Sequence, residues 1–398
     1  MVPPRLCTSR CHFYWLPLTA AYGPVDDSAN WQQLSENLLR SLGFLQLVWV
    51  PQLFHRLQED GLTCVAVKIV DDVLFAAPRH VIEHIISWIQ QDFQLGTIVF
   101  APGTFQFYGL TVTQYDDYSV TVHGDDKLQS FEPFPIDRNR HRQVDEPFNQ
   151  LELRVFRSLN SSIGWLGIAA SPFRAIASSS LQQKGPHVTV KHLVSQCNAL
   201  RNLKKRRTCA LFHRPPVGCY PVSLLVFADA SRTFDHGQLG FVTGLMFGEI
   251  TEGSVFHPIS WSLHNSRRQV KPIGSEETLA AGEAIDEGKV LANAFRKLLA
   301  VKVDLFVVVD SKDLFDTLST CRNATDRSIR AEVSVIRYEF ETHNVSQIIW
   351  IPGKLNLADL LKKSDSPLRT SLEILLYSGT IPLDTTMCEH RISGRSTD

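Results

Sequence analysis

The sequence predicts a chain of α+β and α/β class whose last third forms a mixed five-stranded sheet with flanking helices. Past residue 222, three β-rich stretches separated by short Gly-containing turns indicate an antiparallel meander. Strand and helix patterns then alternate, and this alternation adds parallel strands through crossover connections. The expected strands lie near 223–229, 239–246, 254–262, 304–309 and 347–351, and the expected helices near 275–299, 311–319, 325–342 and 355–362.

The earlier part of the chain begins with an amphipathic helix and a hairpin. Apolar residues recur at spacings of three and four from Trp31 to Leu42, and Gly43 then ends the predicted helix. Two β-rich runs flank Asp71-Asp72, which predicts a β-hairpin with this acid pair at its tip. The pair is either an ordinary polar turn or a ligand set for a divalent metal.

Further elements follow the hairpin in the order helix, strands, loop, helices and linker. Residues 208–222, which include Pro215-Pro216 and Gly218, look like a linker and a domain boundary. The expected elements are a helix over 81–93, strands at 105–113 and 118–123, a loop over 124–148, helices at 154–166 and 190–203, and a linker over 208–222.

The charge of the whole chain excludes little, but its distribution is uneven. Lys and Arg number 40 against 41 Asp and Glu, whereas residues 136–207 hold 13 Lys and Arg against 4 Asp and Glu. This segment is either a nucleic-acid-binding surface or a solvated face. The eight cysteines form no disulfide framework or complete zinc site, and no apolar stretch is long enough to span a bilayer. We therefore expect an intracellular protein, in the cytoplasm or the nucleus, without a membrane partner.

Four acidic residues in the last third are the candidate catalytic site. Asp229 and Asp310 each end an apolar run that predicts a buried strand, where a carboxylate is costly unless it is paired. Glu277 and Asp359 lie at predicted helix starts, where the helix dipole alone also favours an acid. Four carboxylates meeting at one point would suit two Mg²⁺ ions.

Taken together, these stretches resemble the Pol polyprotein of copia-type LTR retrotransposons, from the C-terminal part of the reverse transcriptase through the ribonuclease H. The upstream motifs are Tyr22-Gly23, Ala29, Trp31, Gly43-Phe44, Val70-Asp71-Asp72, Leu95-Gly96, Phe107-Tyr108-Gly109-Leu110, Ile163-Gly164-Trp165-Leu166 and Leu200-Arg201-Asn202-Leu203-Lys204. The ribonuclease H motifs are Ala228-Asp229-Ala230, Ile259-Ser260-Trp261-Ser262, Glu276-Glu277-Thr278-Leu279-Ala280, Val309-Asp310-Ser311 and Asn356-Leu357-Ala358-Asp359.

The resemblance implies a domain order. It comprises an unassigned stretch at 1–15, a partial reverse-transcriptase palm at 16–135 and a basic helical thumb or connection region at 136–207. The linker at 208–222 is followed by a ribonuclease H-like domain at 223–365 and a polar tail at 366–398, which we expect to be disordered after Asp384.

The resemblance also implies a chemistry. Asp229, Glu277, Asp310 and Asp359 would hold two Mg²⁺ ions, for which Mn²⁺ may substitute, and would cleave RNA in an RNA–DNA hybrid. Asp71 and Asp72 would be metal ligands of the RNA-directed DNA polymerase, and primer–template nucleic acid would be a further partner. The residues expected to bind nucleic acid are Arg201, Lys204, Lys205, Arg206, Arg207, Ser231, Ser311 and Asn356.

Departures from the family pattern lead to three expectations. A polymerase palm needs a further Asp on an earlier strand, and this sequence has no strand that would carry it, so we expect a truncated Pol fragment that does not polymerise alone. A second hypothesis is a catalytically inactive nucleic-acid-binding relic or domesticated module. A third is that a longer reading frame supplies the missing palm and fingers.

Overall fold

A computed structural model of the chain describes fourteen stretches of it. The chain divides into two compact units, unit 1 (residues 1–100 and 294–300) and unit 2 (residues 101–293 and 301–398), and each is described by itself. The domain boundaries expected from the sequence remain predictions. The described stretches are 6–9, 12–15, 27–58, 61–182, 188–205, 209–215, 221–232, 237–251, 253–266, 268, 273–320, 326–361, 377–381 and 389–392.

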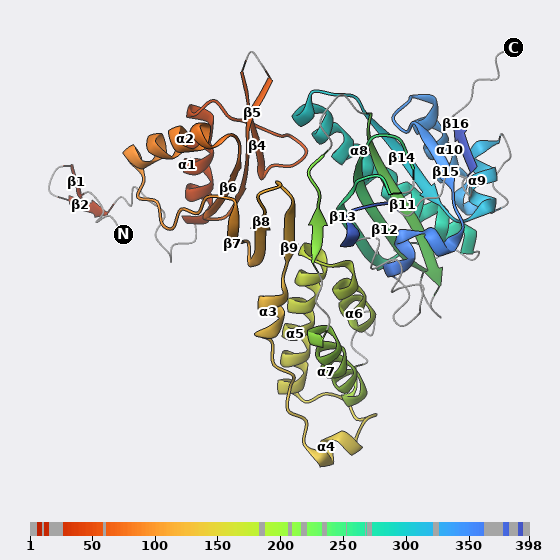
Figure 1. Ribbon diagram of the computed structural model, residues 1–398. Helices are drawn as coiled ribbons and strands as arrows, with labels where there is room; N and C mark the ends of the chain where they lie inside the picture. The colour runs from red at the N-terminus through yellow and green to blue at the C-terminus, as the bar shows by residue number, and fades with distance from the viewer. Residues whose placement is uncertain are drawn as a thin grey trace, which may run out of the picture. The chain divides into compact units, whose positions relative to one another are not determined.

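Unit 1 contains a four-stranded antiparallel sheet with two helices (Figure 1). The strand order is β3-β4-β5-β6, and the core between sheet and helices includes Leu39, Phe44, Phe54 and Ile85. Gly43 ends the first helix with a φ of 82°, which a glycine adopts without strain. The elements are the hairpin strands β1 (Leu6–Ser9) and β2 (His12–Trp15), α1 (Asp27–Ser41), β3 (Leu45–Gln46), β4 (Leu53–Gln58), β5 (Gly61–Ile69), β6 (Asp72–Ala76) and α2 (Arg79–Asp92).

The predicted hairpin around Asp71-Asp72 is confirmed. Strand β5 pairs with β6, and Ile69 lies opposite Asp72. Val70 turns the chain with a φ of 52°, and its carbonyl oxygen accepts a hydrogen bond of 2.8 Å from the indole Nε1 of Trp31. Helix α1 is thereby tied to the hairpin tip, and both acids are exposed there.

The first part of unit 2 is a second four-stranded sheet, of order β10-β9-β8-β7, with helices packed against it. Leu110 and Leu128 join Leu159, Ile163 and Leu200 in one buried cluster. The elements are β7 (Gly103–Phe107), β8 (Leu110–Gln114), β9 (Val120–His123), α3 (Asp125–Gln129), α4 (Arg138–Arg142), α5 (Gln150–Ala169), α6 (Pro172–Gln182), α7 (Val190–Lys205) and β10 (Ala210–Phe212).

Three expectations for this part were wrong. The strand expected at 105–113 is two strands, because Tyr108 and Gly109 adopt φ values of 50° and 69° and reverse the chain. The stretch expected as a loop at 124–148 contains α3 and α4, and the expected linker at 208–222 contains β10, which pairs with β9. Helix α6 was not expected at all. Its serine-rich, weakly periodic sequence is held in place by packing against α5 and β13.

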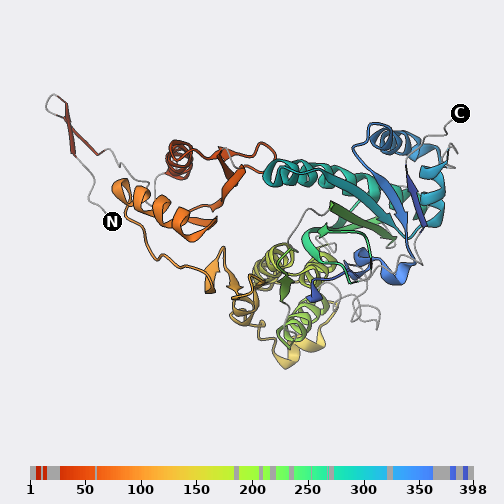
Figure 2. The ribbon, with the colours of Figure 1, turned by 45° about the horizontal axis from the view of Figure 1, so that its top comes forward.

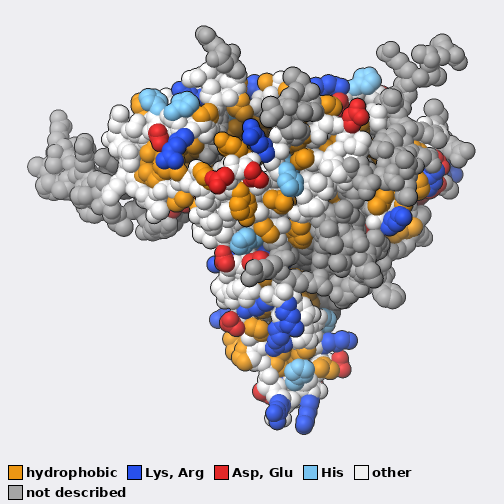
Figure 3. All heavy atoms as spheres, viewed as in Figure 1, with side chains coloured by type: hydrophobic (Ala, Val, Ile, Leu, Met, Phe, Trp, Pro, Cys, Tyr) orange, Lys and Arg blue, Asp and Glu red, His pale blue; other side chains and the backbone are white. Residues whose placement is uncertain are grey.

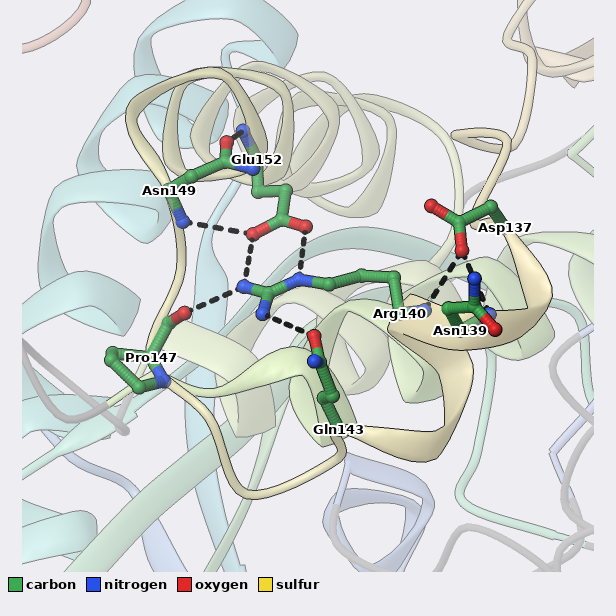
Figure 4. A network of polar contacts seen from close by, with 7 residues as sticks. All are labelled: Asp137, Asn139, Arg140, Gln143, Pro147, Asn149 and Glu152. Atoms are coloured by element: carbon green, nitrogen blue, oxygen red, sulfur yellow. Dashed lines mark hydrogen bonds and ion pairs between the residues drawn. The ribbon is translucent and has the colours of Figure 1, made fainter.

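An ion pair of Arg140 and Glu152 joins α4 to α5 (Figure 4). The guanidinium donates two hydrogen bonds of 2.8 Å to the Glu152 carboxylate and one of 2.7 Å to the carbonyl oxygen of Pro147. Glu152 also accepts from the backbone N–H of Asn149, whose side chain accepts from the N–H of Glu152. This reciprocal capping box caps the N-terminus of α5. Its Glu152 is also the residue that binds Arg140 of α4.

The last part of unit 2 is built on a mixed sheet of order β13-β12-β11-β14-β15-β16 (Figure 2). Strands β11, β12 and β13 form the antiparallel meander, and β14 and β15 add in parallel beyond β11, as the sequence predicted. The elements are β11 (Val222–Arg232), β12 (Gly237–Phe247), β13 (Phe256–Asn265), α8 (Ile273–Leu299), β14 (Val303–Val309), α9 (Lys312–Ser319), η1 (Arg327–Ile329), α10 (Arg330–Glu341), β15 (Gln347–Trp350), η2 (Gly353–Leu355), η3 (Leu357–Leu361) and β16 (Glu389–Ile392).

Two expectations for this sheet needed correction. The helix expected at 355–362 is instead the pair of short 3-10 helices η2 and η3. The stretch expected as a polar tail contains β16, which pairs antiparallel with β15, and it also contains Ile381, which is buried in the core of the sheet. The partly buried ring of Tyr377 packs against the same core as Ile381.

The two faces of the sheet are covered by different elements. A side chain at Gly288 of α8 would meet Val226 and Leu305, so α8 lies over the face that these residues share. The opposite face, which carries Phe227 and Val308, packs against the buried apolar residues of η3.

No helix of the described residues is long and apolar enough to cross a membrane.

Candidate functional site

The register between strands β11 and β14 places two acids, Asp229 and Asp310, at equivalent positions along the neighbouring strands. Strand β11 pairs in parallel with β14, and Phe227 lies opposite Val308. Two residues beyond this pair, the chain carries Asp229 on one strand and Asp310 just after the other. Because side chains alternate between the faces of a sheet, Asp229 lies on the face of Phe227. That face is the one covered by η3.

The third acid comes from η3 itself. All five residues of η3 are buried, and Asp359 exposes 4% of its surface. The residues before and after Asp359 in η3 are apolar and belong to the buried core of the sheet. Their packing therefore fixes the backbone of Asp359. A short 3-10 turn is sufficient here because its backbone is held by tertiary contacts.

The three carboxylates form one cluster. One oxygen atom from each of Asp229, Asp310 and Asp359 lies within 4.8 Å of the other two. Asp229 and Asp359 are each 4% exposed and Asp310 is half-buried. Carboxylates this close repel one another in a medium of low dielectric, and a divalent cation relieves that repulsion by accepting their oxygens as ligands.

The loop segments beside Asp310 restrict its position. The indole Nε1 of Trp350 donates a hydrogen bond of 3.0 Å to the backbone carbonyl of Asp310. A Cβ added to Gly353 would lie 3.0 Å from the Asp310 Oδ2, so only a glycine leaves that oxygen undisturbed. Ser311 begins α9, and its hydroxyl accepts from the backbone N–H of Leu314 at 3.4 Å.

The fourth expected ligand is not in this cluster. Glu277 lies in the first turns of α8 and is half-buried, but its carboxylate does not fall within the group of three. Its neighbour Glu276 is 2% exposed, and a Cβ at Gly237 would lie 2.6 Å from the Glu276 Oε1. The structure therefore brings together three of the four predicted acids.

The residues expected to bind nucleic acid are in different environments. On α7, Arg201 and Lys205 are exposed, while the Lys204 ammonium donates to the carbonyl of Gln129 at 3.0 Å. Arg206 and Arg207 lie outside the described residues. Figure 3 shows several Lys and Arg side chains on the surface formed by α4, α5 and α7.

Two further predicted contacts lie near the carboxylate cluster. Ser231, near the end of β11, is half-buried, with its hydroxyl 3.5 Å from the Oε1 of Gln238. Asn356 is fully buried and its amide is hydrogen-bonded to the backbone. Because the Asn356 side chain has no solvent exposure, this structure gives no support to its expected nucleic-acid contact, which stays a prediction.

The sequence reasoning missed two neighbours of Asp310. Gly353 and Trp350 are far from Asp310 along the chain, and neither residue type signals a site. The nearest motif in the sequence, Asn356-Leu357-Ala358-Asp359, lies just after Gly353 but does not indicate these contacts. Asp71 and Asp72 belong to unit 1 and are exposed at their hairpin tip.

Comparison with known proteins adds little to this geometry. No protein-family model matches the chain, and no curated protein matches it. Solved structures give partial likenesses. The ribonuclease H1 of the archaeon Halobacterium salinarum NRC-1 is 16% identical with a TM-score of 0.27, over 35% of this chain and 93% of that chain. The N-terminal RNase H domain of rv2228c from Mycobacterium tuberculosis is 14% identical with a TM-score of 0.27, over 38% of this chain and 98% of that chain.

One likeness extends further along the chain. The foamy viral protease–reverse transcriptase in complex with double-stranded DNA is 14% identical with a TM-score of 0.18, over 81% of this chain and 58% of that chain. TM-scores this low carry no functional argument. The last part of unit 2 has the fold class expected from the sequence, a mixed sheet with flanking helices.

Proposed function

We propose that the chain is a divalent-metal-dependent nuclease that hydrolyses the RNA strand of RNA–DNA hybrids. The observation that carries the proposal is the carboxylate cluster of Asp229, Asp310 and Asp359. Its oxygens lie within 4.8 Å of one another, just beyond the last residue pair of β11 and β14. The carboxyl ends of sheet strands are where open α/β sheets commonly place their sites.

The donor set fits Mg²⁺. Three carboxylates offer only hard oxygen ligands, which Mg²⁺ and Mn²⁺ prefer, and offer no soft sulfur or imidazole ligand. Asp229, Asp310 and Asp359 would hold the metal, with Glu277 of α8 as the proposed fourth acid. Metal bound there supplies Lewis-acid stabilisation of the negative charge that develops during phosphodiester hydrolysis.

The chain's own part in the reaction is to fix these acids before substrate arrives. Asp229 is held by the β11 ladder and Asp359 by the buried η3, so neither carboxylate has to be ordered on binding. Burial also keeps bulk water from competing for their oxygens, which strengthens the electrostatic interactions at the site.

The choice of substrate follows from the family resemblance. The motif order resembles copia-type Pol, and the ribonuclease H of that family acts on RNA–DNA hybrids. Discrimination of RNA from DNA would rest on contacts to 2′-hydroxyl groups. The exposed Asp71 and Asp72 of unit 1 are proposed as metal ligands that serve a primer–template partner.

The test is the Asp310→Asn variant of the full chain. We expect cleavage of a labelled RNA–DNA hybrid in Mg²⁺ to fall at least about a hundredfold, because the change removes one anionic metal ligand. Hybrid affinity measured in EDTA should stay the same. The matched control is Asp116→Asn, which alters an exposed acid at the β8–β9 turn and should cleave as wild type does.

Absence of hybrid cleavage by the wild-type chain would contradict the proposal. A wild-type chain that binds the hybrid but cleaves nothing in Mg²⁺ or Mn²⁺ would not be a nuclease. If binding were then indifferent to Asp310→Asn and fell steeply with salt, the non-catalytic nucleic-acid-binding module would be the correct description.

A further inference from the structure

Asn356 lies between the two short 3-10 helices that carry the chain toward Asp359. It ends η2 and precedes η3 by one residue. Its side chain has no solvent exposure, although asparagine is a residue that proteins mostly leave at the surface. A buried amide needs partners for both its donor and its acceptor.

Both the donor and the acceptor of this amide form hydrogen bonds, and each bonds to the backbone of a residue that directly precedes an acid of the cluster. The Nδ2 donates a hydrogen bond of 3.1 Å to the carbonyl oxygen of Ala228, a residue 128 positions away in the chain. The Oδ1 accepts one of 3.0 Å from the backbone N–H of Ala358. Ala228 directly precedes Asp229, and Ala358 directly precedes Asp359.

The backbone of Asn356 adds a third contact. Its carbonyl oxygen accepts a hydrogen bond of 3.0 Å from the N–H of Asp359. Asn356 therefore connects the β11 backbone next to Asp229 with the first turn of η3. Its side chain and its backbone each form one hydrogen bond to that turn.

Only an amide of this length satisfies these contacts together. An alanine would leave the Ala228 carbonyl and the Ala358 N–H buried without this partner. An aspartate would set a carboxylate against the Ala228 carbonyl oxygen, where a donor is required. The requirement is geometric, because the fixed amide plane sets the distance between the two backbone segments.

We propose that Asn356 is a positioning residue that sets the spacing of the Asp229 and Asp359 carboxylates for a divalent cation. The inference rests on the proposed function and adds to it the residue that couples the two ligand-bearing segments.

The experiment measures Mg²⁺ binding to the full chain by calorimetry, without nucleic acid, in wild type, Asn356→Ala and Asn356→Ser. We expect Mg²⁺ affinity to fall at least about tenfold in Asn356→Ala and less in Asn356→Ser, which keeps a short donor and acceptor. Hybrid affinity in EDTA should be unchanged. The matched control is Asn344→Ala, an exposed asparagine after α10 that should bind Mg²⁺ as wild type does.

A double-variant cycle separates positioning from general stabilisation. In the Asp359→Asn background, Asn356→Ala should weaken Mg²⁺ binding no further, because the ligand it positions is already gone. An equal further loss in that background would overturn the inference. Wild-type affinity in folded Asn356→Ala would also overturn it, as would failure of both Asn356 variants to fold, since the amide would then serve the fold itself.

Failure of the proposed function gives a different pattern. A wild-type chain that binds no Mg²⁺ and cleaves no hybrid would refute the nuclease, and the positioning role with it. A wild-type chain that does both, with an Asn356→Ala variant equal to it in Mg²⁺ affinity, would refute only the role of Asn356.

Discussion

The position of Asp310 depends on residues that have no chemistry of their own. Gly353 leaves room for the Asp310 Oδ2, and Trp350 holds the Asp310 backbone through its indole N–H. Trp350 ends the short strand β15 and Gly353 follows it. Strand β15 pairs with β14 and thereby returns the chain to the end of that strand. The carboxylate cluster is therefore shaped by a loop as well as by its three acids.

A single methyl group at Gly353 tests this constraint. In Gly353→Ala the new Cβ would start 3.0 Å from the Asp310 Oδ2, so the carboxylate must shift by a few tenths of an ångström. We expect the cleavage rate in Mg²⁺ to fall about tenfold, since small displacements of catalytic groups have large kinetic effects. Gly96→Ala, with open space around its Cβ, is the control. An unchanged rate in Gly353→Ala would show that Asp310 is not confined by this loop.

At the scale of elements, the helical region of unit 2 depends on polar contacts at helix starts. Glu152 lies in the first turn of α5, and 4% of its side chain is exposed. The pKa of Glu152 is held below its ordinary value chiefly because the Arg140 guanidinium donates hydrogen bonds to the carboxylate. The ionised form is therefore favoured by folding.

The pH dependence of stability follows from that direction. A carboxyl group whose pKa is lower in the folded state stabilises the fold above its unfolded pKa of about 4.3, and this contribution is lost as pH falls through the folded value. We expect Glu152→Gln to lower the free energy of unfolding by about 1–2 kcal/mol at pH 7. The difference from wild type should shrink below pH 4, as measured by urea unfolding from pH 3 to 7.

The exposed Glu146 offers a matched control for this measurement. Glu146→Gln should leave stability nearly the same across the range, because surface charges contribute little. A Glu152→Gln difference that stays constant down to pH 3 would mean that the lowered pKa of Glu152 is not what stabilises the folded chain.

At the scale of the whole molecule, the net charge is close to zero, but the charged residues are unevenly distributed along the chain. Net charge is −1, yet residues 136–207 hold most of their charge as Lys and Arg, with Arg201 and Lys205 exposed on α7. A duplex is bound through its phosphates by local cations, so the local charge decides affinity even in a neutral chain.

Salt dependence measures this contribution directly. In the double variant Arg201→Ala, Lys205→Ala, we expect hybrid binding to weaken and the slope of log affinity against log salt to fall by about 1–2, near 0.9 for each lost phosphate contact. Lys302→Ala removes a cation whose side chain is 83% exposed on another part of unit 2 and serves as the control. An unchanged slope in the double variant would exclude α7 from the binding surface.

Strong periodic patterns were predicted well, and weak or compact elements were not. The strand that leads to Asp310 was predicted to within one residue of its observed bounds, because a continuous apolar run reports burial directly. The strand that carries Asp229 was predicted to end at this residue, but β11 continues to Arg232 through its pairing with β12. Helix α6 and strand β10 were missed, and η3 was taken for part of an α-helix. Each of these is short or weakly patterned and is held by packing, which leaves little local signal.

The sequence by itself determined the order of the strands, the amphipathic helices and the presence of an acid after each of two apolar runs, since these depend on local periodicity and burial. Only the tertiary structure decided which acids meet. It placed Asp359 beside Asp229 and Asp310, left Glu277 outside that group and turned Asn356 inward to join η3 to β11. Those outcomes depend on strand register and on contacts between residues far apart in the chain, which no local pattern encodes.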